Sequence, residues 1–121
     1  MEFYSSKIVK PPDLNPGGTL FGGKLLGWID EDAAIFVMSQ LGSKNIVTKY
    51  ISEINFVSSA SNGDIIEMGF EIVKFGRTSI TVKCMVRNKL SKQEIIRIEK
   101  FVFVHVDANG RPTPHGITKE V

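Results

Sequence analysis

The stretch Pro11–Met38, PPDLNPGGTLFGGKLLGWIDEDAAIFVM, joins a proline- and glycine-rich loop to a mostly apolar segment, and it decides the fold. Its first half contains prolines and paired glycines that do not suit a helix interior. In its second half, apolar residues recur at spacings of three and four, as they do along one helical face: Leu25, Leu26, Ile29, Ala33, Phe36 and Val37. We therefore predict a helix from about Gly22 to about Gln40.

The acidic residues of this helix are expected on different sides. A rotation of about 100° per residue places Glu31 and Asp32 opposite the apolar face. Asp30 instead lies next to Val37 and one turn beyond Leu26, on the flank of the buried face. A carboxylate there needs hydrogen-bond partners or a cavity. Asp30 is therefore either a structural carboxylate at the margin of the core or a functional group.

The predicted start of the helix suits an anion or a carbonyl oxygen. Gly22 and Gly23 leave N–H groups unpaired at a helix N-terminus, with no side chain to shield them. A carboxylate two turns further along would be available as a base. The combination of a base with an oxyanion donor fits acyl-transfer chemistry.

The run Asp13–Gly23, DLNPGGTLFGG, followed by LGWID at 26–30, resembles the signature of the hotdog-fold acyl-CoA thioesterases of the YciA-like or brown-fat-inducible type. The likeness extends to Asn62–Asp64, Gly76–Ser79 and Phe101–Asp107, so it covers most of the chain. It implies an α+β hotdog fold, in which a curved antiparallel sheet wraps around one long central helix.

The resemblance also implies a reaction, the hydrolysis of acyl-CoA to free fatty acid and coenzyme A. In this reading the catalytic residues are Asp30, which activates water or attacks the carbonyl itself, and Asn15, contributed by the facing subunit. The oxyanion and substrate-binding residues are Phe21, Gly22 and Gly23. No cofactor is implied beyond coenzyme A as part of the substrate.

A second candidate site is Gly76-Arg77-Thr78-Ser79. By spacing alone it reads as a hairpin loop with a solvated arginine. Its composition also suits an anionic nucleotide, because Arg77 can make paired hydrogen bonds to phosphate and the hydroxyls add donors. In the family a similar run lies beside coenzyme A, and the resemblance therefore assigns coenzyme A binding to Gly76, Arg77, Thr78 and Ser79.

Two alternatives to a thioesterase stay open. Asp13-Leu-Asn15-Pro16 resembles the opening of the hydratase motif of enoyl-CoA hydratases, but Gly18 stands where that motif requires a histidine. Asp13 is then expected to be a turn residue that binds nearby backbone N–H groups. The other alternative is a non-catalytic hotdog module that binds acyl-CoA, which would not need Asn15 and Asp30 together.

Composition narrows the class of protein. A chain of 121 residues suits a single domain, 1–121, with an irregular tail at 111–121. A net charge of +2 without a basic block gives no reason to expect a nucleic-acid partner. The single cysteine, Cys84, excludes an internal disulfide and is expected to be a small buried side chain. No apolar run reaches the ~20 residues of a membrane span, and we expect a cytoplasmic protein without a membrane partner.

No group of His, Cys, Asp or Glu has recognisable metal-ligand spacing, so no metal is predicted. His105 lies within an apolar strand pattern and is expected to be structural. His115 lies in a tail rich in proline and glycine and is expected to be solvated. Acid–base chemistry would then depend on a carboxylate.

Alternating apolar residues predict strands at 46–56, 66–72, 78–86 and 94–106, with a short leading strand at 2–9 and a turn at 58–63. The segment Phe101–Val104 is apolar on both faces, which suits a central strand or one covered by a partner chain. Helix residues Trp28, Ile35 and Met38 project away from the apolar face and favour an interface. The resemblance implies a homodimer or a higher homo-oligomer, such as a trimer of dimers.

Overall fold

The structure, a computed structural model, describes residues 1–118 and 120. Strand β1 spans Glu2–Ile8 and is followed by a 3-10 turn, η1, at Pro11–Asp13 and by helix α1 at Gly22–Leu41. The remaining strands are β2 (Ile46–Ile51), β3 (Asn55–Phe56), β4 (Ile65–Phe75), β5 (Ser79–Asn88) and β6 (Glu94–His105). The predicted helix and the predicted leading strand are confirmed to within two residues.

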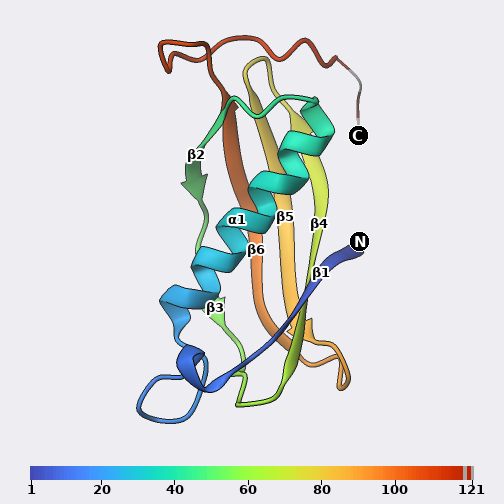
Figure 1. Ribbon diagram of the computed structural model, residues 1–121. Coiled ribbons are helices and arrows are strands. Elements are labelled where there is room, and N and C mark those ends of the chain that lie inside the picture. The colour runs from blue at the N-terminus through green and yellow to red at the C-terminus, as the bar shows by residue number, and fades with distance from the viewer. Residues whose placement is uncertain (119, 121) are drawn as a thin grey trace.

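All strand pairs are antiparallel, and the main order across the sheet is β1-β4-β5-β6-β2, with β3 also paired to β6. Helix α1 runs across one face of this curved sheet (Figure 1). Strands β1 and β2, which the helix separates in the sequence, lie at opposite edges of this order. β6 lies between β5 and β2, which confirms that Phe101–Val104 belongs to a central strand.

Helix α1 ends where glycine was expected to end it. Gly42 has a φ of 66°, in the left-handed region, and its N–H donates to the carbonyl of Met38 at 2.8 Å. The buried residues of the helix are Leu25, Ile29, Ala33, Phe36 and Val37. Leu26 is only half-buried, so the buried face is turned slightly toward Leu25 and away from Asp30.

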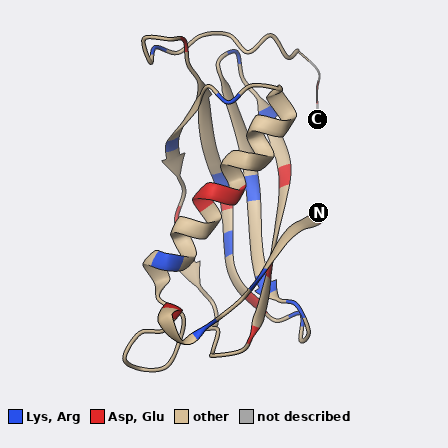
Figure 2. Ribbon diagram, viewed as in Figure 1, with Lys and Arg blue, Asp and Glu red and all other residues tan. Residues whose placement is uncertain are grey.

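This rotation corrects the predicted surroundings of the two acids. Asp30 is exposed, not held on a buried flank, because its side of α1 faces the free edge at β2. Asp32, predicted to face solvent, is half-buried, and it accepts a hydrogen bond from the Ser5 hydroxyl of β1 at 2.6 Å. Residues 30–32 make up the acidic band on α1 in Figure 2.

Strand β1 also changes the predicted outward face of the helix. Trp28 is half-buried, packs against the core and lies beneath the Lys7 ammonium, 5.6 Å from the ring centroid. Met38 is half-buried too, whereas Ile35 remains 54% exposed. The prediction that all three residues face outward therefore holds for Ile35 and is wrong for Trp28 and Met38, which are both half-buried; the Lys7 side chain of β1 lies over the Trp28 ring.

The predicted strand 46–56 is broken into β2 and β3 at Ser52–Ile54. Ser52 still binds β6, since its N–H donates to the Lys100 carbonyl at 2.8 Å and its hydroxyl accepts from the Lys100 N–H at 3.0 Å. Val47 and Tyr50 are about half exposed, at 49% and 54%. The expected half-buried alternation fails here, since among the described residues β2 is the last strand at this edge and has no neighbour on its outer side.

The core lies between α1 and the sheet. It includes Phe36 stacked on Phe70, with ring centroids 5.7 Å apart, and Phe101 stacked on Phe103 at 4.8 Å. Cys84 is fully buried there, as predicted. Burial, together with the nearby charge of Asp32, raises the pKa of the Cys84 thiol to about 12, so this thiol is not a nucleophile at neutral pH.

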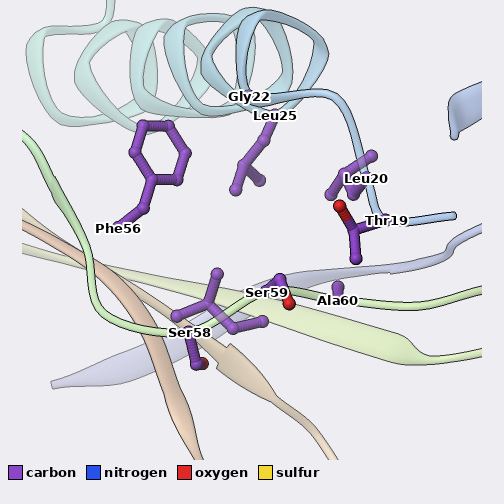
Figure 3. Close-up of a pocket in the computed structure, with 9 residues that line it drawn as sticks. Thr19, Leu20, Gly22, Leu25, Phe56, Ser58, Ser59 and Ala60 are labelled. Carbon is purple, nitrogen blue, oxygen red and sulfur yellow. The ribbon is translucent and has the colours of Figure 1, made fainter. Parts of the chain in front are cut away.

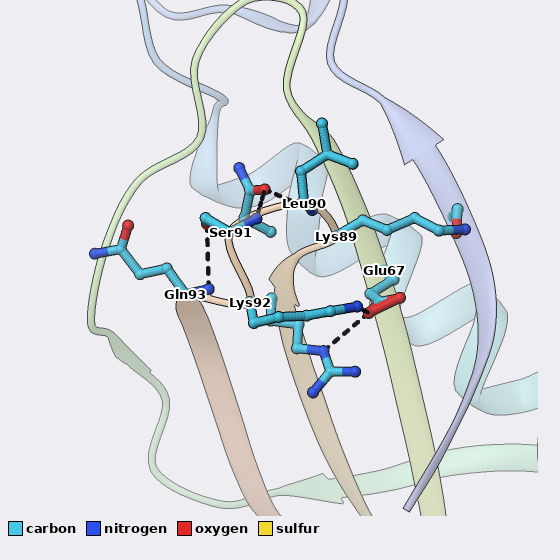
Figure 4. Close-up of polar contacts among 9 residues, drawn as sticks. Glu67, Lys89, Leu90, Ser91, Lys92 and Gln93 are labelled. Atoms are coloured by element: carbon cyan, nitrogen blue, oxygen red, sulfur yellow. Dashed lines mark hydrogen bonds and ion pairs between the residues drawn. The ribbon is translucent and has the colours of Figure 1, made fainter.

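A buried carboxylate fixes the hairpin between β5 and β6. Glu67 of β4 accepts hydrogen bonds from Arg87 Nε at 2.9 Å and from Lys92 Nζ at 3.3 Å (Figure 4). Burial alone would raise the pKa of the Glu67 carboxyl, but the two cations hold it below its usual value. The adjacent Lys89 ammonium reaches Ser6 of β1 at 3.0 Å. This charged cluster therefore ties three strands together.

Candidate functional site

The loop before α1 is closed by its own polar groups. Asp13 is buried, accepts a hydrogen bond from the Lys10 N–H at 2.9 Å and pairs with the Lys24 ammonium at 2.5 Å. The Lys24 hydrogen bond, followed by that from Lys10, lowers the pKa of the Asp13 carboxyl. The prediction that Asp13 binds backbone as a turn residue is confirmed. Both of its partners are in the loop or at the start of the helix. Both carboxylate oxygens are therefore engaged, and Asp13 is not placed to act as a catalytic base.

The Asn15 amide is held within the same loop. Its Nδ2 donates to the Thr19 hydroxyl at 3.0 Å, and its Oδ1 accepts from the Thr19 N–H at 3.1 Å. An asparagine side chain has one further N–H and a further lone pair. Asn15 is therefore oriented by Thr19 and can still bind a ligand.

The first turn of α1 has no side-chain cap. Phe21 precedes it and is 46% exposed, and its carbonyl accepts from Leu25 N–H at 3.0 Å. The N–H groups at Gly22 and Gly23 come before that first intrahelical bond. A Cβ at position 22 would lie 3.2 Å from Cζ of Phe56, so glycine permits the close approach of this ring to the helix.

A pocket of about 390 Å³ opens beside this helix start, and we call it the helix-start pocket (Figure 3). Leu20, Leu25 and Ile95 supply apolar walls, and Phe56 stands at its side toward Gly22. Thr19, Ser58 and Ser59 add hydroxyl groups, while Ala60 completes the lining. Its size lies in the range of small-molecule sites, and its mixture of apolar walls and a few hydroxyls is typical of them.

Asp30 lies two turns along α1 from Gly23 and is oriented by one hydroxyl. Thr48 Oγ1 of β2 donates to Asp30 Oδ1 at 2.8 Å. No described residue donates to its other oxygen, so the exposed carboxylate can bind solvent or a ligand there. An oriented carboxylate with access to water has the geometry of a general base.

Not all the predicted residues meet within one chain. Asn15 and Asp30 each have a partner of their own, Thr19 and Thr48, and no hydrogen bond joins them. The Gly76–Ser79 loop lies at the end of the molecule away from Gly22 and Gly23, near the C-terminal end of α1 (Figure 1). With 20 residues at about 1.5 Å each, α1 separates its two ends by about 30 Å.

The Gly76–Ser79 loop connects β4 to β5, as the hairpin interpretation predicts. Gly76 N–H closes it by donating to the Ser79 carbonyl at 2.9 Å. Arg77 is exposed at its tip, whereas Thr78 and Ser79 are half-buried. The C-terminal tail packs beside this loop: His115, predicted to be solvated, is half-buried and its Nε2 lies 2.9 Å from the Ser79 carbonyl.

Two contacts of the candidate residues could not be predicted from the sequence. Thr48 looked like one residue of an alternating strand, and its contact with Asp30 depends on how β2 packs beside α1. The tail contact of His115 depends on the path of residues 107–115 after β6. His105, expected to be structural, is confirmed as such, with Nδ1 3.1 Å from the Thr113 carbonyl and Nε2 3.3 Å from the Ser43 hydroxyl.

Among residues 1–118 and 120, no group of three or more His, Cys, Asp or Glu side chains is arranged to hold a metal ion. In the same described part of the chain, no helix is both long and apolar enough to cross a bilayer.

Residues 17–94 match the sequence profile of the thioesterase superfamily. The chain belongs to this superfamily. Among curated thioesterase relatives, an uncharacterised acyl-CoA thioester hydrolase of Haemophilus influenzae is 30% identical over 110 residues, which are 86% of this chain and 71% of the relative. The acyl-CoA thioester hydrolase YciA of Salmonella typhimurium is 29% identical over 93% of this chain and 89% of its own.

Solved thioesterase structures have the same architecture. A hexameric thioesterase from Yersinia pestis has a TM-score of 0.85 and 26% identity, with 93% of each chain covered. An acyl-CoA hydrolase from Staphylococcus aureus, solved with butyryl coenzyme A and coenzyme A, has a TM-score of 0.81 and 29% identity over 91% of this chain and 66% of that one. The hotdog fold expected from the resemblance is confirmed, with one long helix against a curved antiparallel sheet.

Proposed function

We propose that this chain is an acyl-CoA thioesterase that hydrolyses acyl-CoA to a free acid and coenzyme A, with Asp30 as its general base. The observation that carries the proposal is the arrangement on α1. An accessible carboxylate, oriented by the Thr48 hydroxyl, follows an uncapped helix start beside the helix-start pocket. Membership of the thioesterase superfamily supports the same reaction.

Substitutions reported for the Staphylococcus aureus hydrolase support the choice of residues. Alanine variants of one asparagine, one aspartate and one threonine of that enzyme have been solved. Its asparagine and aspartate are fifteen positions apart, which is the separation of Asn15 and Asp30. Its threonine follows the aspartate by seventeen positions, against eighteen from Asp30 to Thr48. We therefore add Thr48 to the proposed site, as the residue that orients the base.

In the proposed reaction, Asp30 takes a proton from water as the water oxygen attacks the thioester carbonyl. The carbonyl oxygen becomes an oxyanion and accepts hydrogen bonds from N–H groups at Gly22 and Gly23, where the helix dipole favours negative charge. The C–S bond then breaks, and the proton on Asp30 passes to the coenzyme A thiolate. Asn15 orients the water or the carbonyl, and Phe21 borders the substrate.

The proposed site is composite. No hydrogen bond joins Asn15 to Asp30 within one chain, and the proposed coenzyme A loop at Gly76–Ser79 lies at the far end of α1 from Gly22. A second copy placed antiparallel along the free β2 edge would bring opposite ends of two helices together. Among the described residues no strand pairs with the outer side of β2, so this edge offers backbone groups for pairing, together with the exposed side chains of Val47 and Tyr50. We propose a homo-oligomer with dimers built on this edge, and the hexameric thioesterases among its structural neighbours are consistent with it.

The test is release of free thiol from a series of acyl-CoA substrates, followed with a thiol-reactive dye. The expected result is release far above the rate in buffer, abolished when the acyl group is attached through a non-hydrolysable thioether. Tight binding of acyl-CoA without release would establish instead a binding module. Sedimentation at micromolar concentration should show an assembly larger than the 13.4 kDa chain, and a compact monomer would refute the composite site.

A further inference from the structure

We propose that His115 is a positioning residue, which anchors the C-terminal tail against the Gly76–Ser79 loop and holds that loop ready for the phosphate groups of coenzyme A. This inference rests on the proposed function, because it assigns the loop to the nucleotide end of the substrate. It concerns a residue that sequence reasoning treated as solvated.

The tail contacts the loop through two hydrogen bonds from His115. Its ring Nε2 lies 2.9 Å from the Ser79 carbonyl, and its backbone N–H donates to the Arg77 carbonyl at 3.3 Å. The ring also packs edge-on against Phe75, at the end of β4, with centroids 6.0 Å apart and an interplanar angle of 67°. One side chain thus touches both strands that the loop connects.

The partners of the imidazole determine which nitrogen carries the proton. A carbonyl oxygen only accepts, so Nε2 must donate to Ser79. On the other side of the ring, the Ile117 N–H donates to Nδ1 at 3.1 Å, which must therefore be unprotonated. Both nitrogens are in use, and reversing the ring would break both bonds. The His115 ring is therefore held in one orientation by two specific hydrogen bonds.

The preceding part of the tail is fixed to β6, which limits where His115 can lie. Thr113 N–H donates to the His105 carbonyl at 2.9 Å, and Pro112 forms a bridge with Val106. The His105 ring reaches back to the Thr113 carbonyl at 3.1 Å. His105 N–H in turn donates to the Thr78 carbonyl at 2.8 Å. The tail and β6 thus both hold the Gly76–Ser79 loop in place through hydrogen bonds.

These contacts leave the loop rich in donors. The carbonyl groups of Arg77, Thr78 and Ser79 all accept hydrogen bonds from the tail or from β6. Among the described residues, the N–H groups of Arg77 and Thr78 have no hydrogen-bond acceptor, and the Arg77 side chain is exposed. Phosphate oxygens only accept, so a loop whose carbonyls are already engaged, and whose donors are free, is suited to bind them. A loop already held in place also loses less conformational entropy on binding.

The test compares the parent with His115→Phe, which keeps a ring against Phe75 but removes both ring hydrogen bonds. Coenzyme A affinity, measured by calorimetry, should fall about 5- to 30-fold, the worth of one or two hydrogen bonds. His115→Gln can still present an N–H toward the Ser79 carbonyl and should recover part of the affinity. Arg77→Ala serves as a reference that removes a proposed phosphate contact directly.

Kinetic measurements distinguish a weakened contact with coenzyme A from a general loss of structure. KM for acyl-CoA should rise by the same factor in His115→Phe while kcat stays near the parental value. Hydrolysis of the same acyl group on N-acetylcysteamine, which lacks the nucleotide, should be unchanged. Unchanged coenzyme A affinity, or equal losses on both substrates, would overturn the role of His115.

The outcomes also separate this inference from the proposed function. A parent that binds coenzyme A without hydrolysing acyl-CoA would refute the proposed function. The affinity of His115→Phe for coenzyme A would still test the positioning role of His115. A parent without measurable affinity for coenzyme A would overturn the inference itself.

Discussion

Asp30 and Asp32 lie on opposite flanks of α1, and each accepts a hydrogen bond from one hydroxyl, Thr48 at 2.8 Å and Ser5 at 2.6 Å. Their surroundings differ. Asp30 faces the free edge of the sheet at β2 and is exposed, whereas Asp32 lies under β1 and is half-buried. The two carboxylates thus make similar hydrogen bonds in different surroundings. Water and a second chain can reach Asp30, whereas Asp32 lies against the core. Access, more than the nearest partner, distinguishes a candidate base from a structural acid.

The largest effect expected from this comparison is that of Asp30→Asn. The amide keeps the size of the side chain, and its oxygen can still accept from Thr48, but it cannot take a proton. Turnover of acyl-CoA should fall by about 10² to 10⁴, the usual contribution of a positioned base. Coenzyme A binding, measured by calorimetry, should survive. Parental turnover in this variant would remove Asp30 from the reaction.

The next effect tests whether Thr48 orients the base. Thr48→Val replaces the hydroxyl by a methyl group of similar size, so Asp30 loses its donor while the strand keeps a β-branched residue. Turnover should fall by about 10- to 100-fold, in line with a hydrogen bond to a charged group. Thr48→Ser should restore most of the rate, and the free energy of unfolding should change by no more than about 0.5 kcal/mol in either variant. A Thr48→Val enzyme as fast as the parent would show that Asp30 needs no orientation.

Sequence periodicity could predict the elements but not which flanks of the helix are covered. The spacing of Leu25, Ile29 and Phe36 depends only on helix geometry, and the expected bounds of α1 were accurate. The cover over Asp32 depends on β1, which pairs with β4 more than fifty residues away. The openness of Asp30 follows from β2 lying at the edge. Such long-range pairing leaves no periodic signal near the helix itself.

The same reasoning separates what could be predicted of the candidate site. Asn15, Gly22 and Asp30 stand within one continuous stretch, so a motif reveals them together. Thr48 lies in a different element and joins the site only through the packing of β2 against α1. His115 lies in a segment without secondary structure, and its contact with Ser79 depends on the path of the tail. Contacts made across elements are determined by the fold, not by local sequence.

A much smaller effect is expected on the other flank. Asp32→Asn keeps an oxygen for the Ser5 hydroxyl and removes a charge that is half-buried, so the fold should be retained. Turnover should stay within a few fold of the parent, measured in parallel with Asp30→Asn as its matched variant. If Asp32→Asn were inactive and Asp30→Asn active, the assignment of the two flanks would be reversed.

The smallest expected effect concerns Cys84, which lies on the buried side near Asp32. Its pKa of about 12 is due first to burial and second to the charge of Asp32. Because burial is the larger cause and also blocks access, a thiol-reactive dye at pH 8 should leave Cys84 unlabelled in the native parent. Asp32→Asn should leave it unlabelled too, since only the smaller cause is removed, and both proteins should label fully in denaturant. Rapid native labelling of the parent would mean that the flank under β1 opens to solvent, which would undo the contrast with Asp30 and require a correction for protein thiol in every thiol-release assay.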